Sequence, residues 1–591
     1  MKNWSDVFLR NQIGENVWHM KKGIKEFIAD NILMKDIFNR SDKDTRVREY
    51  IMPKSIIWKT GNNEKSTIEN EDVLLEKRTG QITLVPVNAC ILRNAGGKAG
   101  IILDFGIELQ GGIQILTWKC GGNANARIRV RFGESVMEAM SDIGQNGSTN
   151  DHAVRDHIID VSRYGTVEIG NTGFRFVRID LLEECTLEIK SIRAVFVYRD
   201  SEYKGSFNCS DPLLNKIWST GAYTVHLNMQ EYLWDGIKRD RLVWIGDMHP
   251  ETSTIQAVFG YDECVPKSLD FVRDETPLPG WMNGIPTYSM WWILIQHNWY
   301  MQNGDFEYLK QQRSYLVKLL KQLGEHVDVE GKETTPEFRF IDWPTSGNTE
   351  AVDAALHAMY ILAMEAGAEL LKMLGENKEA AEALNVVKRL RKYKANYNGS
   401  KQAAALLALA EVEDKFSINR DVLAVEGARK LSSFMGYYIL RARGLAGDIK
   451  GCLDVIREYW GGMLFLGATT FWEDFNVEWL EDAARIDEIT PEGKVDIHGS
   501  YGDHCYKGYR HSFCHGWASG PTPWMSEFIL GVRILEPGCS KIKISPDLGD
   551  LKWVEGTYPT PKGLVYISHE KQQDGRIKSS IKVPDGVEVV K

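Results

Sequence analysis

The sequence lacks long apolar runs, and it has no excess of basic residues. The apolar stretch 290–295 ends at Gln296, far short of the ~20 residues that span a bilayer, so no membrane partner is expected. Lys and Arg number 71 against 81 Asp and Glu, giving a net charge of -10, which argues against a nucleic-acid partner. A chain of 591 residues, 43% hydrophobic and 26% charged, is typical of a soluble globular protein with about three or four domains.

Closely spaced cysteine pairs and a secretion signal are also missing. None of the nine cysteines forms a C-x-x-C pair, so buried thiols are predicted rather than a disulfide framework. Near the N-terminus, Asp6, Arg10 and Glu15 interrupt any apolar core of a signal peptide. We therefore expect a cytoplasmic location.

The N-terminal third of the chain is rich in predicted strands. Over 127–132, arginines alternate with Ile128, Val130 and Phe132, which is the period of a half-buried strand. Clusters of Gly and Asn at 121–123, 144–147 and 170–173 are predicted turns between strands. We predict a mixed segment over 1–80 and a jelly-roll-like antiparallel β-sandwich over 81–204.

A helical pattern follows over 205–535. Ser210-Asp211-Pro212 predicts a helix start, because a capping side chain precedes a proline near the first helical position. The stretches 305–327 and 350–374 are the clearest amphipathic helices. The absence of alternating strands excludes a parallel α/β barrel and fits a toroid of paired helices. A helical solenoid has the same period, but no fixed-length repeat supports it.

The final segment, 536–591, returns to a strand pattern. Ile542 and Ile544 alternate with Lys541 and Lys543, and prolines and glycines mark turns further on. This predicts a small C-terminal β-sandwich, or part of one that earlier strands complete.

The segment 231–251 gathers carboxylates, basic residues and tryptophans. Gly236, Gly246 and Pro250 are expected to break helical continuity, which would place several carboxylates on a loop at a helix end. Sugars need such a mixture, since tryptophan rings pack on their C–H faces while carboxylates and arginine bind hydroxyls. The ordinary alternative is a solvated, salt-bridged loop.

Two later segments are further candidates. Glu473 lies beside Trp472 after 467–470, although an ordinary helix start is the better explanation of that segment taken alone. The segment 498–524 holds four of the thirteen histidines: His498, His504, His511 and His515. Their spacing matches no familiar zinc pattern, so no metal site is predicted there. A loop over a sugar pocket is the preferred interpretation.

Together these motifs resemble glycoside hydrolase family 78, the inverting α-L-rhamnosidases. That family carries Asp, then Arg-Asp-Glu-Arg-Leu-Gly-Trp-x-Gly-Asp, similar to 235–247 here, and Gly-Ala-Thr-Thr-x-Trp-Glu, matched by 467–473. Ser-Phe-x-His at 512–515 and the tail from 531 also resemble it, so the similarity covers about 205 to the end. The resemblance implies an (α/α)6 barrel flanked by N-terminal and C-terminal antiparallel β-sandwiches, and cofactor-free hydrolysis of terminal α-L-rhamnosyl groups with inversion.

The resemblance also assigns roles to single residues. The family's general acid is the Glu of Arg-Asp-Glu-Arg, and counting back from Trp244 and Asp247 places that position on Asp240 here; either Asp replaces Glu or the loop is one residue shorter. The general base falls on Glu473. Side-chain chemistry predicts substrate binding by Asp235, Arg239, Trp244, Asp247, Trp281, Trp291 and Trp343, and the resemblance adds His515.

Three other functions stay open at this point. Asp240 in place of Glu keeps alive a related (α/α)6-barrel glycosidase for another neutral or deoxy sugar, and also a carbohydrate-binding protein with impaired catalysis. A helical-repeat scaffold for protein partners is disfavoured, because the tryptophans cluster with carboxylates. The expected partner is a rhamnose-containing carbohydrate or glycoside, and the sequence predicts no oligomeric state.

Overall fold

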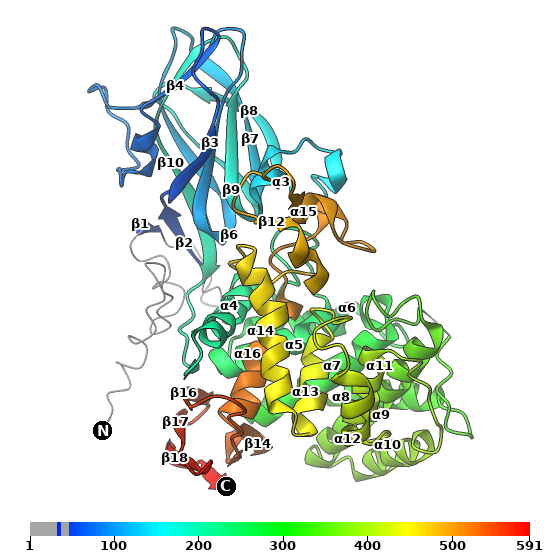
Figure 1. The fold of residues 1–591 in the computed structure, drawn as a ribbon. Helices are drawn as coiled ribbons and strands as arrows, with labels where there is room; N and C mark the ends of the chain where they lie inside the picture. The colour runs from blue at the N-terminus through cyan, green and yellow to red at the C-terminus, as the bar shows by residue number, and fades with distance from the viewer. Residues whose placement is uncertain (1–31, 37–45, 337, 591) are drawn as a thin grey trace.

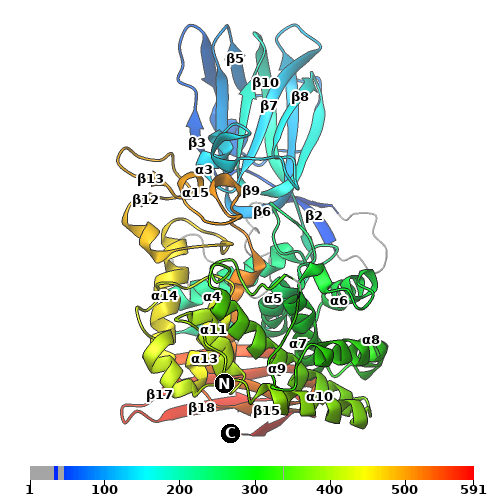
Figure 2. The ribbon, with the colours of Figure 1, turned by 90° about the vertical axis from the view of Figure 1, so that its right-hand side faces the viewer.

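The computed structural model describes residues 32–36, 46–336 and 338–590, and it is elongated (Figure 1). A β-rich body, drawn in blue and cyan, lies at one end and a helical body in green and yellow below it. Two further sheets from the C-terminal part of the chain cross beneath the helices (Figure 2). Much of the predicted mixed segment 1–80 lies outside the described residues.

The β-rich body is built on one ten-stranded sheet. Seven of its strands follow the order β1 (Ile32–Asp36), β2 (Arg46–Ile51), β10 (Thr186–Arg199), β6 (Ala99–Cys120), β9 (Thr166–Leu181), β7 (Asn125–Gly133) and β8 (Asp156–Ser162). The others are β3 (Ser55–Lys59), which pairs with β6, β4 (Ser66–Glu69), which pairs with β5, and β5 (Cys90–Asn94), which also pairs with β10. All of these pairings are antiparallel.

The predicted alternation in β7 is confirmed. Ile128, Val130 and Phe132 are fully buried, while Arg127 extends to Asp160 across the pair with β8. The apolar residues therefore face the interior of the sandwich, and the charged residues lie on the opposite face of β7, beside polar residues of the neighbouring strand.

The predicted turn at 170–173 is wrong, because β9 runs through it. The register between β6 and β9 shifts between Gly111 and Ile113, opposite this segment. Gly170 has a φ of 95°, which a glycine adopts without steric cost. The cluster therefore marks a β-bulge within a long strand rather than a chain reversal.

The helical body is a closed double ring, as the resemblance implied. Six inner helices contact one another in sequence, and the last contacts the first. They are α5 (Ile245–Val258), α7 (Pro286–Asn303), α9 (Thr349–Met373), α11 (Lys401–Leu409), α13 (Gly436–Leu445) and α16 (Pro521–Trp524). The alternate helices α4 (Pro212–Asn228), α6 (Cys264–Glu275), α8 (Phe306–Glu325), α10 (Asn377–Leu390), α12 (Lys415–Ile418) and α14 (Ile449–Phe465) form the outer layer.

Capping side chains set several of the helix starts that the sequence predicted. Asp211 caps α4 by accepting from the Leu213 amide, with Pro212 in the first turn. The two predicted amphipathic helices correspond to α8 and α9. α9 alone among the described helices is long and apolar enough to cross a membrane by length and composition, and 83% of that stretch is buried within the barrel.

The C-terminal sheets recruit strands from elsewhere in the chain. A four-stranded sheet follows the order β11 (Ser206–Cys209), β16 (Trp553–Thr560), β17 (Gly563–Lys571) and β18 (Ile577–Lys582). A three-stranded sheet follows β14 (Val532–Glu536), β15 (Lys541–Ile544) and β19 (Glu588–Val590). Both β11 and β14 begin inside the range predicted for the helical domain, so earlier strands complete the C-terminal body.

The β-rich body and the helical body share an apolar core. The buried cluster of the sandwich includes Tyr223, Leu227, Ile237 and Cys514, which all belong to the helical part of the chain. The Tyr223 hydroxyl donates to the Glu108 carbonyl over 2.6 Å. The sandwich is thus packed onto the end of the barrel where the candidate site lies.

Candidate active site

The predicted carboxylate loop connects α4 to α5. Asp235 and Asp240 lie on this loop, and Asp247 lies in the first turn of α5, whose N-cap is Trp244. The carboxylates are therefore at a helix end, as expected. Gly246 and Pro250 both lie inside α5, so the breaks predicted at these two residues are wrong. A proline removes one backbone hydrogen bond, and the buried helix continues past it.

Backbone hydrogen bonds join the three predicted segments into one site. The Gly516 amide donates to the Asp235 carbonyl over 2.9 Å, and the His515 amide donates to Phe471 over 2.9 Å. The Glu473 amide donates to the Ser512 carbonyl over 3.0 Å, and the Ser512 amide donates back to the Glu473 carboxylate over 3.1 Å. Glu473 thus lies in an irregular segment that is fixed by the neighbouring irregular segment around Ser512, and it does not lie at a helix start.

His515 lies at the centre of a buried carboxylate cluster. Its Nε2 atom is 3.7 Å from an oxygen of each of Asp235, Asp247 and Glu473. Burial lowers the pKa of His515 well below its usual range. Burial, with added repulsion from neighbouring carboxylates, raises the pKa of Asp235 and of Asp247 well above the usual value. Burial therefore favours the neutral forms of His515, Asp235 and Asp247.

Arg239 connects the two candidate catalytic carboxyls. Its Nη1 donates to Asp240 Oδ1 over 3.0 Å and its Nη2 donates to Glu473 Oε1. Two oxygens that accept from one guanidinium lie within roughly 8 Å of each other, because each hydrogen bond spans about 3 Å. Inverting glycosidases hold their carboxyls about 6.5–9.5 Å apart, and retaining ones about 5–5.5 Å.

The other two basic residues of the loop point away from the Asp240 carboxylate. Lys238 is buried and pairs with Glu134 over 2.9 Å and Glu138 over 3.3 Å, both from the β-rich body. Arg241 donates to the carbonyls of His152 and Asn171. The remaining contact of Asp240 within the loop is the Trp244 Nε1–H, which donates to Oδ2 over 3.2 Å.

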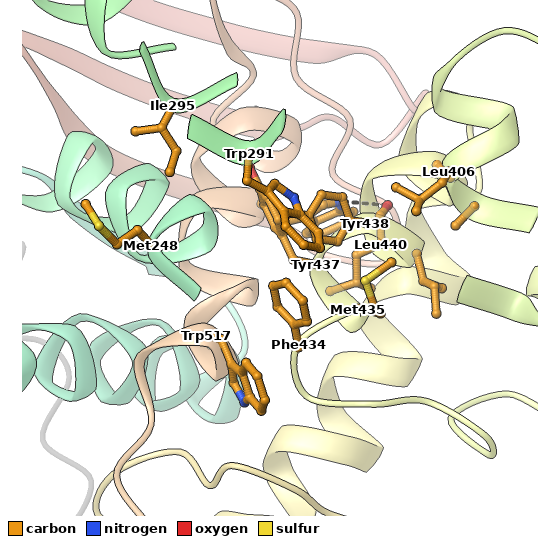
Figure 3. Packing of buried hydrophobic residues seen from close by; sticks show 14 of the residues in the cluster. Met248, Trp291, Ile295, Leu406, Phe434, Met435, Tyr437, Tyr438, Leu440 and Trp517 are labelled. Carbon is orange, nitrogen blue, oxygen red and sulfur yellow. Dashed lines mark hydrogen bonds between the residues drawn. The ribbon is translucent and has the colours of Figure 1, made fainter. Parts of the chain in front are cut away.

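An arc of aromatic rings encloses the carboxylates. Trp244 contacts Tyr288 at 5.9 Å between ring centroids, and Tyr288 contacts Trp291 at 5.5 Å. Phe434 lies between Trp291 and Trp517, as Figure 3 shows, and Trp517 packs on His515 at 4.2 Å. Such an apolar wall suits a sugar with a methyl group.

The predicted tryptophans differ in their placement. Trp244 contacts Asp240, whereas Trp291 is fully buried at the base of the arc. Trp281 packs against His326, and Trp343 packs against Phe340 and His504. The last two rings therefore contact neighbours other than the carboxylate cluster.

The described residues contain one group with metal-ligand geometry, formed by Glu134, Glu138 and His498. The Lys238 ammonium already lies against this group, 3.3 Å from the Nε2 of His498. A cationic side chain thus supplies the positive charge that these carboxylates require. The nine cysteines are free thiols, and all but Cys185 and Cys505 are buried.

Sequence reasoning missed several residues at the site. Tyr288 donates to Asp247 over 3.3 Å, Trp517 donates to the Glu473 carbonyl over 2.9 Å, and His152 approaches Asp240. Tyr288 lies on α7, three residues before Trp291 and four before Trp292, and helical spacing could have revealed it. His152 belongs to the β-rich body and left no signal in the sequence.

The closed double ring of helices, with paired carboxyls at one end, defines a glycosidase-type six-hairpin domain. The family model of the bacterial α-L-rhamnosidase six-hairpin glycosidase domain matches residues 202–412, and that of the bacterial α-L-rhamnosidase C-terminal domain matches residues 531–590. In these two regions the chain is similar to bacterial α-L-rhamnosidases.

Similar proteins agree with this assignment. An α-L-rhamnosidase of Alteromonas sp. (strain LOR) is 25% identical over 82% of this chain and 55% of its own length. The chain thus spans about half the length of that relative. The family 78 rhamnosidase of Bacillus sp. GL1 shares the fold with a TM-score of 0.69 at 23% identity, over 88% of this chain and 55% of that one. A Klebsiella oxytoca rhamnosidase, solved with rhamnose bound, has a TM-score of 0.61 at 17% identity. This match covers 82% of this chain and 96% of that one.

Proposed function

We propose that the protein hydrolyses terminal α-L-rhamnosyl groups from glycosides or oligosaccharides with inversion at the anomeric carbon. The observation that carries the proposal is the shared guanidinium. Asp240 and Glu473 come from segments more than 200 residues apart, and Arg239 contacts both. The rhamnosidase-type domains and the rhamnose bound to the Klebsiella oxytoca protein support the choice of sugar.

In the proposed mechanism, Asp240 donates a proton to the departing glycosidic oxygen. Glu473, ionised and held by Arg239 and the Ser512 amide, removes a proton from the water that attacks the anomeric carbon. The proton lost by Asp240 leaves with the alcohol, and the proton from water remains on Glu473 until it returns to solvent. Asp235, Asp247 and His515 are placed to bind ring hydroxyls.

The aromatic arc explains the preference for a deoxy sugar. The methyl group of rhamnose replaces a hydroxymethyl group, and it gains from a wall that offers no hydrogen bonds. The ring faces of Trp244 and Tyr288 provide such a surface, because the indole N–H and the phenol hydroxyl are already directed at Asp240 and Asp247. An alternative neutral sugar with a hydroxyl at this point would leave that hydroxyl unpaired, at a cost of about 1–3 kcal/mol.

The test is hydrolysis of an aryl α-L-rhamnoside, with the first-formed anomer followed by NMR. We expect initial release of the β-anomer. Glu473→Gln and Asp240→Asn should each reduce kcat about 10²–10⁴-fold, which is the usual contribution of acid–base catalysis. Glu478→Gln, at an exposed glutamate on the same segment, is the matched control.

Three outcomes would contradict the proposal in different ways. First-formed α-anomer would exclude inversion. Turnover of another aryl glycoside in a panel, but not of the rhamnoside, would assign a different sugar. Rhamnose binding without turnover would indicate a carbohydrate-binding protein.

A further inference from the structure

A histidine of the β-rich body reaches the candidate general acid. His152 lies in the segment before β8, and its Nδ1 is 3.2 Å from Asp240 Oδ1. Its other ring nitrogen, Nε2, is 3.4 Å from Asp151 Oδ2. We propose that His152 is a positioning residue for Asp240, which holds the carboxyl in place for proton transfer to the leaving group. This inference rests on the proposed function.

The backbone beneath Asp240 needs support from outside the loop. Asp240 and Arg241 have φ values of 56° and 55°, in the left-handed region. This conformation costs about 1–2 kcal/mol for each residue that is not glycine, so surrounding contacts must maintain it. Arg241 donates to the His152 carbonyl and to the Asn171 carbonyl, over 2.8 Å each. The β-rich body therefore holds this turn at two places, at His152 before β8 and at Asn171 in β9.

His152 is itself fixed by charged neighbours. Arg510 donates to Asp151 over 2.5 Å, and Asp151 faces the imidazole Nε2. The imidazole therefore lies between the carboxylates of Asp151 and Asp240.

Two side chains contact Oδ1 of Asp240. Arg239 donates to this oxygen over 3.0 Å from within the loop, and Nδ1 of His152 lies 3.2 Å from it in the β-rich body. A general acid must be held within hydrogen-bond reach of the leaving oxygen, so contacts that fix its carboxyl matter for proton transfer.

The experiment compares two aryl α-L-rhamnosides, one with a highly activated leaving group and one with a poor leaving group. Protonation of the leaving oxygen matters only for the second. We expect His152→Ala to lower kcat for the poor leaving group by about tenfold or more, with little change for the activated one, since acid catalysis as a whole contributes about 10²–10⁴-fold. His152→Gln, which keeps a polar group but cannot hold a proton at this pH, should show a smaller loss of the same kind.

A double-mutant cycle separates this role from a structural one. In an Asp240→Asn background, His152→Ala should cause no further loss, because residues that act as a unit are not additive. The control is His297→Ala. His297 lies on α7 and pairs with Glu369 over 2.8 Å. It should leave both substrates unaffected.

Two results would overturn the positioning role alone. One is that the wild-type enzyme turns over both rhamnosides and His152→Ala has the same kcat as wild type for the poor leaving group. The other is an equal loss on both substrates that persists in the Asp240→Asn background. Absence of wild-type turnover on both rhamnosides would overturn the proposed function, and the positioning role with it.

Discussion

Glu251 is a carboxylic acid with no access to water, directly behind the cluster around His515. Asn228 donates to its Oε1 over 3.3 Å, and within the described residues its Oε2 has no hydrogen-bond partner. Burial, with the charge of Asp247, raises the pKa of Glu251 well above its usual value of 4.5. Each unit of such a shift corresponds to about 1.4 kcal/mol of stability lost at neutral pH.

We therefore expect Glu251→Gln to raise the Tm at neutral pH. Asn228 can donate equally to the amide oxygen, and the amide has no proton to lose. Because the pKa is raised in the folded protein, the native glutamate costs no folding stability below pH 4.5. It destabilises the folded protein increasingly as the pH rises above that value. The advantage of the variant should therefore disappear in melting curves recorded below that pH.

Glu330→Gln, at an exposed glutamate, provides the comparison and should leave the Tm unchanged at either pH. A Glu251→Gln variant that melts at a lower temperature than wild type at neutral pH would show that the carboxylate is ionised and stabilising in the folded protein.

The site residues divide into those a sequence can reveal and those it cannot. The spacing of 235–247 and the Glu473 segment predicted carboxylates that the structure brings together around His515. Such motifs are readable because neighbours in sequence share one loop. His152 reaches the same site through tertiary packing, and no local pattern marks it. Trp517 lies within the candidate segment 498–524, but nothing in that segment distinguishes it from the other aromatic residues.

At the scale of elements, the start of α5 depends on the small size of Gly246. A Cβ at this position would lie 2.6 Å from the Tyr288 ring and 3.1 Å from Trp291. Helix propensity alone would favour alanine by about 1 kcal/mol. We expect Gly246→Ala to destabilise the protein instead, by about 1–3 kcal/mol, because the buried rings must shift.

The displacement should also affect binding, since Tyr288 donates to Asp247. Thermal unfolding and KM for an aryl rhamnoside would measure the two effects. Gly347→Ala, where an added Cβ meets nothing within 4 Å, is the control. An increase in Tm for Gly246→Ala would mean that helix propensity outweighs the clash.

Element prediction succeeded where one periodicity dominated. Capping residues and amphipathic spacing located α4, α8 and α9 to within a few residues. It failed at 170–173 and at Pro250, because glycine and proline also occur inside elements when a partner strand or a buried neighbour compensates. Closure of the ring depends on contacts between distant helices and came from the resemblance.

At the scale of the whole molecule, one buried ammonium joins the β-rich body to the catalytic loop. Lys238 lies between Glu134 and Glu138 and also donates to the carbonyl of Tyr509 over 3.0 Å. Burial raises the pKa of Glu134 to about 7 even with Lys238 beside it. Removing the cation would leave two carboxylates buried without a counter-charge.

We expect Lys238→Met to destabilise the protein by about 3–5 kcal/mol, the usual cost of breaking a buried ion pair. The loss should be smaller at low pH, where the glutamates take up protons. Differential scanning calorimetry at two pH values would measure it. Lys378→Met, at an exposed lysine on α10, is the control. If both variants had an equally small effect on stability, the two bodies would be held together by apolar packing alone.

The strand pair β11–β16 has a consequence for biosynthesis. The Ser206 hydroxyl contacts the Thr557 hydroxyl at 2.8 Å, across a separation of 351 residues. A ribosome making this chain releases β11 long before its partner strand exists. The emerging polypeptide must keep that edge unpaired throughout translation of the barrel, so native assembly of this sheet is a post-translational event for which a chaperone that shields strand edges would be useful.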